Sequence, residues 1–338
     1  MKKIFFAILC TGAVISCAKE EVITVEKEAI TFENAFVDNA TKALDGYTVN
    51  TGNLTSFNVW GTTQMPGTGS PVVPIFNEVA VSLNGTDWTY GAAYTQYWIP
   101  DNHYEFAAAK NYKAGSTVVV DGLPTTFDYE AASQADLIYA YAEADGKTTG
   151  NNDEVSFTFD HLLSKAYFTV KNEMSPENAN YSYRISDLAI NNAVVKGTYT
   201  IATGTWATDG EYSLSFGNVN GLADATAADA VKVFAGTTNY TSHYSRLLIP
   251  SEYNDANKLN ITCTIETLYG DSVIDVENYD RDLAFTFVKG HAYNFILTLQ
   301  NPGDAIKFDV VAVNEWITDH NSDGVSGDED KLPNMDNQ

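Results

Sequence analysis

Strict alternation of apolar and polar residues recurs along this chain, and this feature most restricts the possible fold. Val155, Phe157 and Phe159 alternate with polar residues, so their side chains point to one face of an extended strand. The same period of two recurs in four later segments: residues 166–170, 284–287, 293–297 and 306–310. No amphipathic segment is long enough to predict a major helix, although residues 129–137 are compatible with a short one. The sequence therefore predicts an all-β protein of antiparallel, half-buried strands.

A polar segment rich in turn-forming residues separates the predicted strands into two groups. This segment, residues 143–152, follows about 100 residues of mature sequence and precedes a longer strand-rich part. We expect an N-terminal propeptide or linker strand over residues 17–42, two tandem antiparallel β-sandwich domains over residues 43–150 and 151–318, and an acidic tail over 319–338.

The N-terminus predicts export. Two lysines precede an apolar run over residues 4–15, which is too short to span a bilayer and is typical of a signal peptide over residues 1–16. Residues 14–17 (VISC) resemble a bacterial lipobox, in which the cysteine is acylated and becomes the mature N-terminus. The acidic residues that follow resemble a surface-export signal. We expect lipidation of Cys17 and a surface-exposed lipoprotein of the cell outer membrane; an ordinary secretory signal is the alternative.

The cysteines exclude an intrachain disulfide in the mature protein. Cys10 leaves with the signal peptide and Cys17 is expected to be acylated, so Cys263 stands alone. Cys263 lies in an alternating apolar run, which favours a buried, unreactive thiol. A secreted chain of this length must then be held together by burial of apolar surface.

Charge and motifs argue against several functional classes. The formal net charge of −25 disfavours nucleic acid and anionic lipid headgroups as partners. The chain has no nucleophile elbow, no phosphate-binding glycine loop and no HExxH, and its five histidines are dispersed. His161, at a predicted strand end, is interpreted as a structural residue. We therefore expect no enzymatic activity, no catalytic residue and no required cofactor.

One local pattern suggests a metal ion. Residues 319–330 follow the calcium-loop template D-x-N-x-D-G with a carboxylate at the twelfth position. Asp319, Asn321, Asp323 and Asp330 are the candidate Ca²⁺ ligands. Position twelve is aspartate rather than the longer glutamate, and no helices are predicted on either side, so a solvated acidic tail is the competing interpretation.

Tryptophans supply an alternative binding chemistry, because flat rings stack on the apolar faces of sugars. The candidates are Trp60, Trp88, Trp98, Trp206 and Trp316. Each lies within or beside a predicted strand, where burial in the core is the more common outcome.

Four segments together resemble the fimbrillin-like family of pilus subunits. They are residues 94–108 (YTQYWIPDNHYEFAA), residues 157–168 (FTFDHLLSKAYF), residues 247–250 (LLIP), and residues 289–295 (KGHAYNF) with the closing run 310–316. Each motif is weak alone, but their order covers nearly the whole chain. The resemblance implies a transthyretin-like C-terminal sandwich.

The resemblance also implies a mechanism of assembly. Subunits of the family lose an N-terminal strand to a trypsin-like protease, and the vacated groove accepts a strand from the next subunit, which is a form of β-augmentation. Residues 22–36 carry alternating apolar positions that suit such a groove, and Lys42 stands where processing is expected, in place of the usual arginine. The candidate donor is the C-terminal segment with Ile306, Phe308, Val310 and Ala312 on one face. An ordinary internal strand would show the same pattern.

These observations predict a structural subunit of a cell-surface fimbrium, assembled by proteolysis-triggered donor-strand exchange and contributing to adhesion. The expected partners are other fimbrial subunits, the outer membrane through the lipid, and a host glycan or protein ligand, with no nucleic acid. The alternative is a surface glycan-binding lipoprotein for nutrient capture, in which the tryptophans would be exposed.

Overall fold

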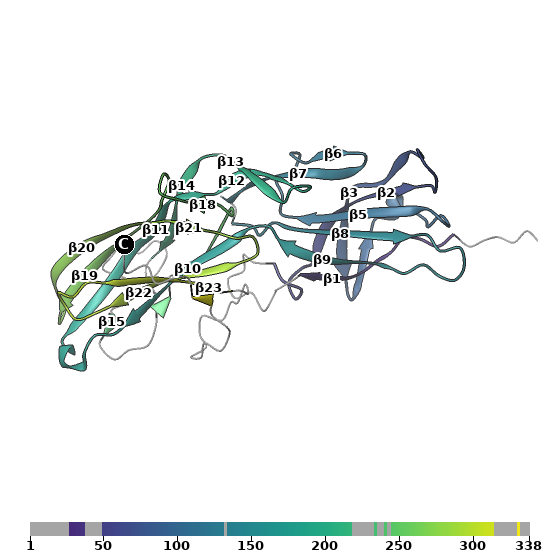
Figure 1. The fold of residues 1–338 in the computed structure, drawn as a ribbon. Coiled ribbons are helices and arrows are strands. Elements are labelled where there is room, and N and C mark those ends of the chain that lie inside the picture. Colours follow the sequence, from purple (N-terminus) through teal and green to yellow (C-terminus); the bar gives the residue numbers. More distant parts are fainter. Residues whose placement is uncertain are drawn as a thin grey trace, which may run out of the picture.

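The protein is an elongated molecule built from β-strands (Figure 1). The computed structural model describes residues 27–37, 49–131, 134–217, 233–234, 240–241, 245–313 and 330–331. Within these ranges the helical elements are two short 3-10 turns, η1 (Ala92–Tyr94) and η3 (Pro176–Asn178). The predicted all-β class is therefore confirmed.

Seven strands close into a barrel in the order β1-β4-β3-β2-β5-β8-β9. Their bounds are β1 (Phe32–Val37), β2 (Ser56–Gln64), β3 (Val72–Asn84), β4 (Asp87–Tyr90), β5 (His103–Lys110), β8 (Ile138–Asp145) and β9 (Val155–His161). Neighbouring strands run antiparallel, except that β1 and β9 are parallel. Closure removes the free edges that an open sheet would expose.

Aromatic side chains fill the barrel. Exposure alternates along the whole of β9, with Val155, Phe157 and Phe159 inside, as the period of two predicts. Gly61 on β2 makes room for this packing, because a Cβ at Gly61 would lie 2.9 Å from the Phe76 ring and 3.0 Å from the Phe106 ring.

The other end of the molecule contains two further sheets. One has the order β16-β10-β22-β23-β24, with β17 also paired to β10, and the other has the order β14-β11-β19-β20, with β15 paired to β11. The bounds in the first are β10 (Ser164–Asn172), β16 (Tyr240–Thr241), β17 (Arg246–Leu248), β22 (Ala292–Leu299), β23 (Lys307–Val313) and β24 (Asp330–Lys331). Those in the second are β11 (Tyr181–Val194), β14 (Glu211–Gly217), β15 (Val233–Phe234), β19 (Leu259–Tyr269) and β20 (Ser272–Leu283). The pair β18 (Glu252–Tyr253) and β21 (Phe285–Thr286) stands apart.

A four-stranded sheet links the two ends. Its order is β13-β12-β7-β6, with β6 (Val118–Val120), β7 (Leu123–Glu130), β12 (Lys196–Thr200) and β13 (Thr205–Thr208). Strand β7 lies in sequence between barrel strands β5 and β8, whereas β12 follows β11. Phe127 on β7 packs against Trp60 of the barrel, with ring centroids 6.0 Å apart, and both are fully buried. The two ends of the molecule therefore share one continuous hydrophobic core.

Three details differ from the sequence-based expectations. The short helix over 129–137 is wrong at Tyr129 and Glu130, because both end strand β7 and pair with β12. The strands are not all antiparallel, since β10 pairs with β22 in parallel over eight residues, as β1 does with β9 over five. The polar segment 143–152 lies at the end of β8 and in the connection to β9, two strands that pair within the same barrel.

Candidate functional site: the groove occupied by the N-terminal strand

The barrel is closed by a strand from the very start of the described chain. Strand β1 lies between β4 and β9. Its pairing with β9 runs from Phe32 opposite Val155 to Val37 opposite Phe159, whereas its pairing with β4 is limited to Phe32 opposite Trp88. The barrel is thus held strongly on the β9 side of β1 and weakly on the β4 side.

Residues just before β1 extend the same arrangement. The Trp98 N–H donates to the Glu28 carbonyl and the Ile30 N–H to the Gln96 carbonyl, both at 2.9 Å. On the opposite side, the Val155 N–H donates to the Thr31 carbonyl at 2.9 Å. We call residues 28–37 the closing segment, because backbone hydrogen bonds join it to other parts of the chain on both sides.

The inward face of the closing segment is apolar and buried. Ile30, Phe32, Ala35 and Val37 are each at most 5% exposed. The Phe32 ring lies among four other rings, with centroid distances of 5.6 Å to Phe76, 5.7 Å to Tyr90, 6.2 Å to Phe106 and 5.7 Å to Phe157. Without the closing segment, the barrel would present an open groove with a deep aromatic pocket at the position of Phe32.

A β-bulge at Asn34 sets which residues face inward. Asn34 has φ 44°, a conformation that asparagine tolerates better than most residues, and the register with β9 shifts between Glu33 and Ala35. The bulge turns Ala35 inward and leaves Phe36 49% exposed.

The predicted processing residue, Lys42, lies outside the described residues, as does the lipidation residue Cys17. The described residues on either side of the segment that contains Lys42 are both anchored. The Val37 N–H donates to the Thr51 hydroxyl at 3.0 Å, and the Val49 N–H donates to the Asp136 carboxylate at 2.9 Å.

The predicted donor strand coincides with β23. Phe308 and Val310 are each 3% exposed, and Ile306 packs at the edge of the same core. Ala312 pairs with Tyr293, within a register between β22 and β23 that runs from Thr298 opposite Lys307 to Ala292 opposite Val313. In the monomer, β23 is therefore an integral strand of its own sheet.

The closing segment and β23 share an apolar pattern. Residues 30–33 read Ile-Thr-Phe-Glu and residues 306–309 read Ile-Lys-Phe-Asp, and position 37 and position 313 are both valine. This similarity can be read from the sequence, but it points to a shared binding groove only once the structure places Phe32 in the aromatic pocket.

The other predicted site residues are not brought together by the described structure. Asp319, Asn321 and Asp323 lie outside it, and Asp330 belongs to β24, opposite Ala312. Cys263 is buried, as predicted, and burial raises the pKa of its thiol to about 12.

The described tryptophans do not form an exposed platform. Trp60 is fully buried and Trp98 is 8% exposed, while Trp88 and Trp206 are partly buried; Trp316 lies outside the described residues. The Trp206 indole N–H donates to the Leu162 carbonyl at 3.2 Å. These contacts favour the interpretation of the described tryptophans as core residues.

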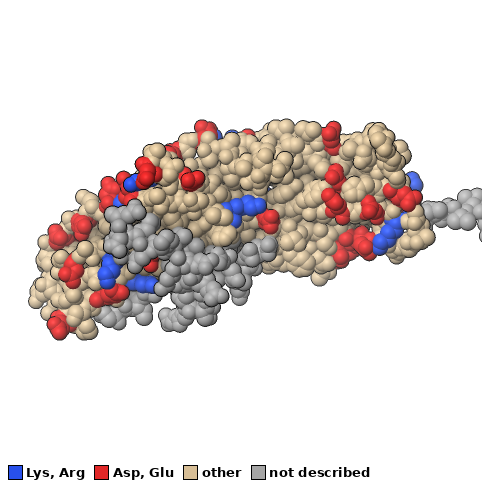
Figure 2. All heavy atoms as spheres, viewed as in Figure 1, with Lys and Arg blue, Asp and Glu red and all other residues tan. Residues whose placement is uncertain are grey.

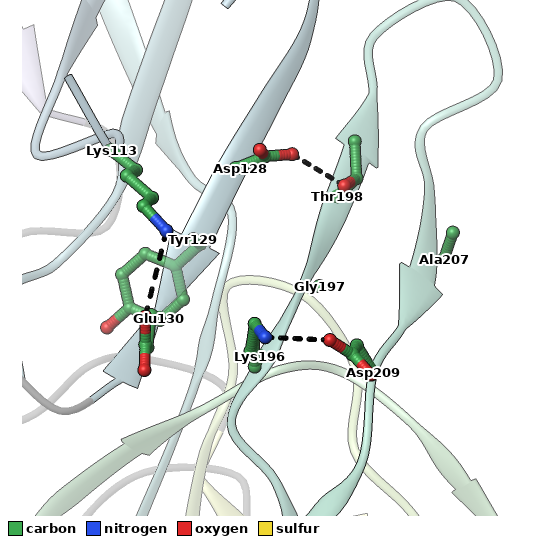
Figure 3. A pocket seen from close by; sticks show the side chains of 9 residues that line it. All are labelled: Lys113, Asp128, Tyr129, Glu130, Lys196, Gly197, Thr198, Ala207 and Asp209. Atoms are coloured by element: carbon green, nitrogen blue, oxygen red, sulfur yellow. Dashed lines mark hydrogen bonds and ion pairs between the residues drawn. The ribbon is translucent and has the colours of Figure 1, made fainter. Parts of the chain in front are cut away.

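A hollow of about 180 Å³ lies on the linking sheet (Figure 3). It is lined by Lys113, Asp128, Tyr129, Glu130, Lys196, Gly197, Thr198, Ala207 and Asp209. Both lysines are paired with lining acids, Lys196 with Asp209 at 2.8 Å and Lys113 with Glu130 at 3.9 Å. The hollow thus presents no uncompensated cationic group for an anionic ligand.

Among the described residues, no helix is long and apolar enough to cross a membrane.

Comparisons with known proteins agree with the resemblance found in the sequence. A model of the fimbrillin-like family matches residues 24–316. A fimbrial protein from Bacteroides vulgatus is similar in fold, with a TM-score of 0.61, 14% identity, and coverage of 86% of this chain and 99% of the other. A candidate cell adhesion protein from Bacteroides ovatus has a TM-score of 0.50, 16% identity, and coverage of 86% and 98%. A comparison with curated proteins gives no match.

Proposed function

The chain belongs to the fimbrillin-like family, and from this premise we propose that it is a structural subunit of a cell-surface fimbrium that assembles by donor-strand exchange. The observation that carries the proposal is the closing segment. It completes the barrel, buries Phe32 in an aromatic pocket, and precedes the segment that contains Lys42. A strand that is essential to the monomer and separable by one cut is what strand exchange requires.

The first step in the proposed mechanism is cleavage after Lys42. The cut separates the closing segment from residues that follow it, together with the lipid on Cys17. The closing segment then remains bound only by non-covalent contacts, which include the burial of Ile30, Phe32 and Val37 at roughly 1.5–3 kcal/mol each. Its departure is therefore unfavourable unless another strand takes its place.

The second step is insertion of a strand from another subunit. The C-terminal segment suits the groove because Ile306 and Phe308 repeat the spacing of Ile30 and Phe32. In this arrangement Phe308 occupies the pocket of Phe32, and Asp309 takes the partly exposed position of Glu33. Since β23 is paired with β22 in the monomer, it must detach from its own sheet before it can be donated.

Two further expectations belong to the same proposal. The lipid on Cys17 would hold the precursor at the outer membrane until cleavage, and adhesion to a host ligand would be a property of the assembled fimbrium. The separate hydrophobic cluster inside the barrel supports a two-domain organisation, and the larger cluster, which includes Trp60 and Ala107 of the barrel strands, joins the two ends.

The test is limited trypsin treatment of the full chain, followed by mass spectrometry and size-exclusion chromatography. Cleavage at Lys42 should convert monomers to oligomers that resist dissociation in mild denaturant. A Lys42→Ala variant should stay monomeric under the same treatment. A fully cleaved chain that remains monomeric at high concentration would contradict the proposal.

A peptide experiment tests the donor separately, without disturbing β23 in its own sheet. A synthetic peptide of residues 304–314 should bind the cleaved chain and block oligomer formation. The same peptide with alanine in place of Phe308 should bind at least roughly 100-fold more weakly, because loss of a buried phenylalanine costs about 3–5 kcal/mol. Equal inhibition by both peptides would exclude the proposed register.

A further inference from the structure

Titratable side chains from two neighbouring strands gather on the outside of the barrel. His103 and Glu105 lie two residues apart on β5 and therefore on the same face. Glu143 lies directly opposite Glu105 on β8, and Asp145 lies directly opposite His103. These residues form a square of potential ligands on two rigid strands, and the intervening Tyr104 is fully buried on the other face. Figure 2 shows acidic side chains gathered at the barrel end of the molecule, and others spread over the opposite end.

Three of these side chains lie close enough to serve one ion. One ring nitrogen of His103, one carboxylate oxygen of Glu105 and one of Glu143 all lie within 4.8 Å of one another. Ligand atoms around a tetrahedral zinc ion are roughly 3.4 Å apart, given metal–ligand distances of about 2.0–2.2 Å. Rotation of the two flexible glutamate side chains would bring the three ligand atoms from within 4.8 Å of one another to the spacing that a zinc ion requires, without moving the backbone.

The charge balance of this group also favours a cation. Like charges directly opposite on neighbouring strands are destabilising, and in the described part of the chain no ion pair joins Glu105 or Glu143 to a lysine or arginine. The Tyr141 hydroxyl lies 2.7 Å from the Glu105 carboxylate and 2.9 Å from the Glu143 carboxylate. A phenol has one proton to donate, so two carboxylates compete for it, and a positive ion would relieve this repulsion.

The histidine is positioned as in many metal sites. Its Nδ1 lies 2.8 Å from the Asp145 carboxylate. A carboxylate on one ring nitrogen fixes the orientation of a ligating histidine and raises its basicity, which leaves Nε2 for the ion. A set of one imidazole nitrogen and two carboxylate oxygens suits zinc and related transition ions better than calcium, which prefers oxygen alone.

We propose that His103, Glu105 and Glu143 bind a divalent transition-metal ion of the zinc type, with Asp145 as a positioning residue. The site is distinct from the predicted calcium loop and from the groove of the closing segment. The ion would join β5 to β8 across the outer face of the barrel, and its remaining coordination positions would face solvent.

The experiment is titration of the full chain with zinc by calorimetry, and with cobalt(II) by visible absorption, which reports on coordination geometry. The His103→Gln and Glu143→Gln variants remove one ligand each from exposed or half-exposed positions. Glu277→Gln is the matched control, since Glu277 is an exposed carboxylate on β20. Circular dichroism of the wild-type chain and of every variant establishes that they remain folded.

The wild-type chain and Glu277→Gln should show the same saturable site, with affinity lowered at least roughly tenfold in His103→Gln and Glu143→Gln. Asp145→Asn should weaken binding less than either ligand variant and should change the cobalt spectrum. Saturable zinc binding that persists unchanged in both ligand variants would place the ion elsewhere and would overturn the proposal. The absence of saturable binding, or equal affinity in the wild-type chain, the control and both ligand variants, would overturn the proposal.

Discussion

His161 and Asp136 are buried partners at the junction of the two ends of the molecule. The His161 Nδ1 lies 2.8 Å from the Asp136 Oδ2, and both side chains are at most 1% exposed. The same carboxylate oxygen accepts a hydrogen bond from the Val49 N–H at 2.9 Å. The aspartate thus joins the end of β9 to the chain that follows the predicted processing segment. This geometry fits the interpretation of His161 as a structural residue.

Substitution of Asp136 by alanine should be strongly destabilising. It removes the acceptor of the Val49 N–H and the partner of His161 in a buried setting, and we expect a loss of about 3–5 kcal/mol in the free energy of unfolding. Urea denaturation measures it. Asp153→Asn is the control, because the Lys147–Asp153 ion pair is exposed and should contribute less than about 1 kcal/mol. Similar losses in both variants would contradict the structural role of the buried pair.

Replacement of Phe32 by alanine should destabilise the uncleaved monomer by about 3–5 kcal/mol, since it empties the aromatic pocket. Phe36→Ala is a matched control on the same strand, because that ring is 49% exposed. Its effect should stay within about 0.5 kcal/mol. If the two variants unfold at the same urea concentration, the Phe32 side chain is not buried in the aromatic pocket of the barrel.

Alkaline pH should destabilise the fold through its buried tyrosines. Burial raises the pKa of Tyr139 and Tyr253 from 10.0 to about 12. Below pH 10 these tyrosines are protonated in both states, and the stability linked to them is fully present. Between pH 10 and 12 the unfolded state ionises first, so stability falls by up to about 2–3 kcal/mol per tyrosine.

Tyr253→Phe tests this assignment. The Tyr253 hydroxyl accepts from the Val194 N–H at 3.0 Å and donates to the Asn192 carbonyl at 3.1 Å. The variant should be less stable than wild type by about 1–2 kcal/mol below pH 10. Its further loss between pH 10 and 12 should be smaller than that of wild type. Urea unfolding across this range provides both values, and parallel curves would refute the assignment.

The Cys263 thiol should be inert in the folded protein. Burial raises the pKa of this thiol to about 12, so almost none of it is present as the reactive thiolate at neutral pH. A thiol reagent such as Ellman's should leave Cys263 unmodified until denaturant is added, as checked by mass spectrometry with a Cys263→Ser variant as reference. Rapid labelling under native conditions would show that this strand opens locally.

The strand content was predictable because its signal is local. In β9, apolar and polar residues alternate, and the strand has the expected inward residues. The segment of β22 is also a strand, but it is buried on both faces rather than half-buried, since Ile296 and Thr298 are only 5% and 8% exposed. The family was recognisable because several weak motifs kept their order along the chain.

The arrangement of the strands was not predictable in the same way. Parallel pairing of β1 with β9, and of β10 with β22, leaves no trace in local periodicity. The bulge at Asn34, which decides that Ala35 rather than Phe36 faces inward, depends on the partner strand. His103 and Glu143 come together through cross-strand register, so a search for ligands close in sequence could not find them.

The pairing of β1 with β9 also has a kinetic meaning. The paired residues are 122 or 123 residues apart in sequence, and the hydrogen-bonded Thr31 and Glu154 are 123 apart, so these contacts are long-range in sequence. Since loop closure over such a distance is slow and entropically costly, we expect barrel closure to be a late event in folding. Because a chain is synthesised from its N-terminus, the closing segment must wait for β9. The strand that is translated first is then the last to be docked.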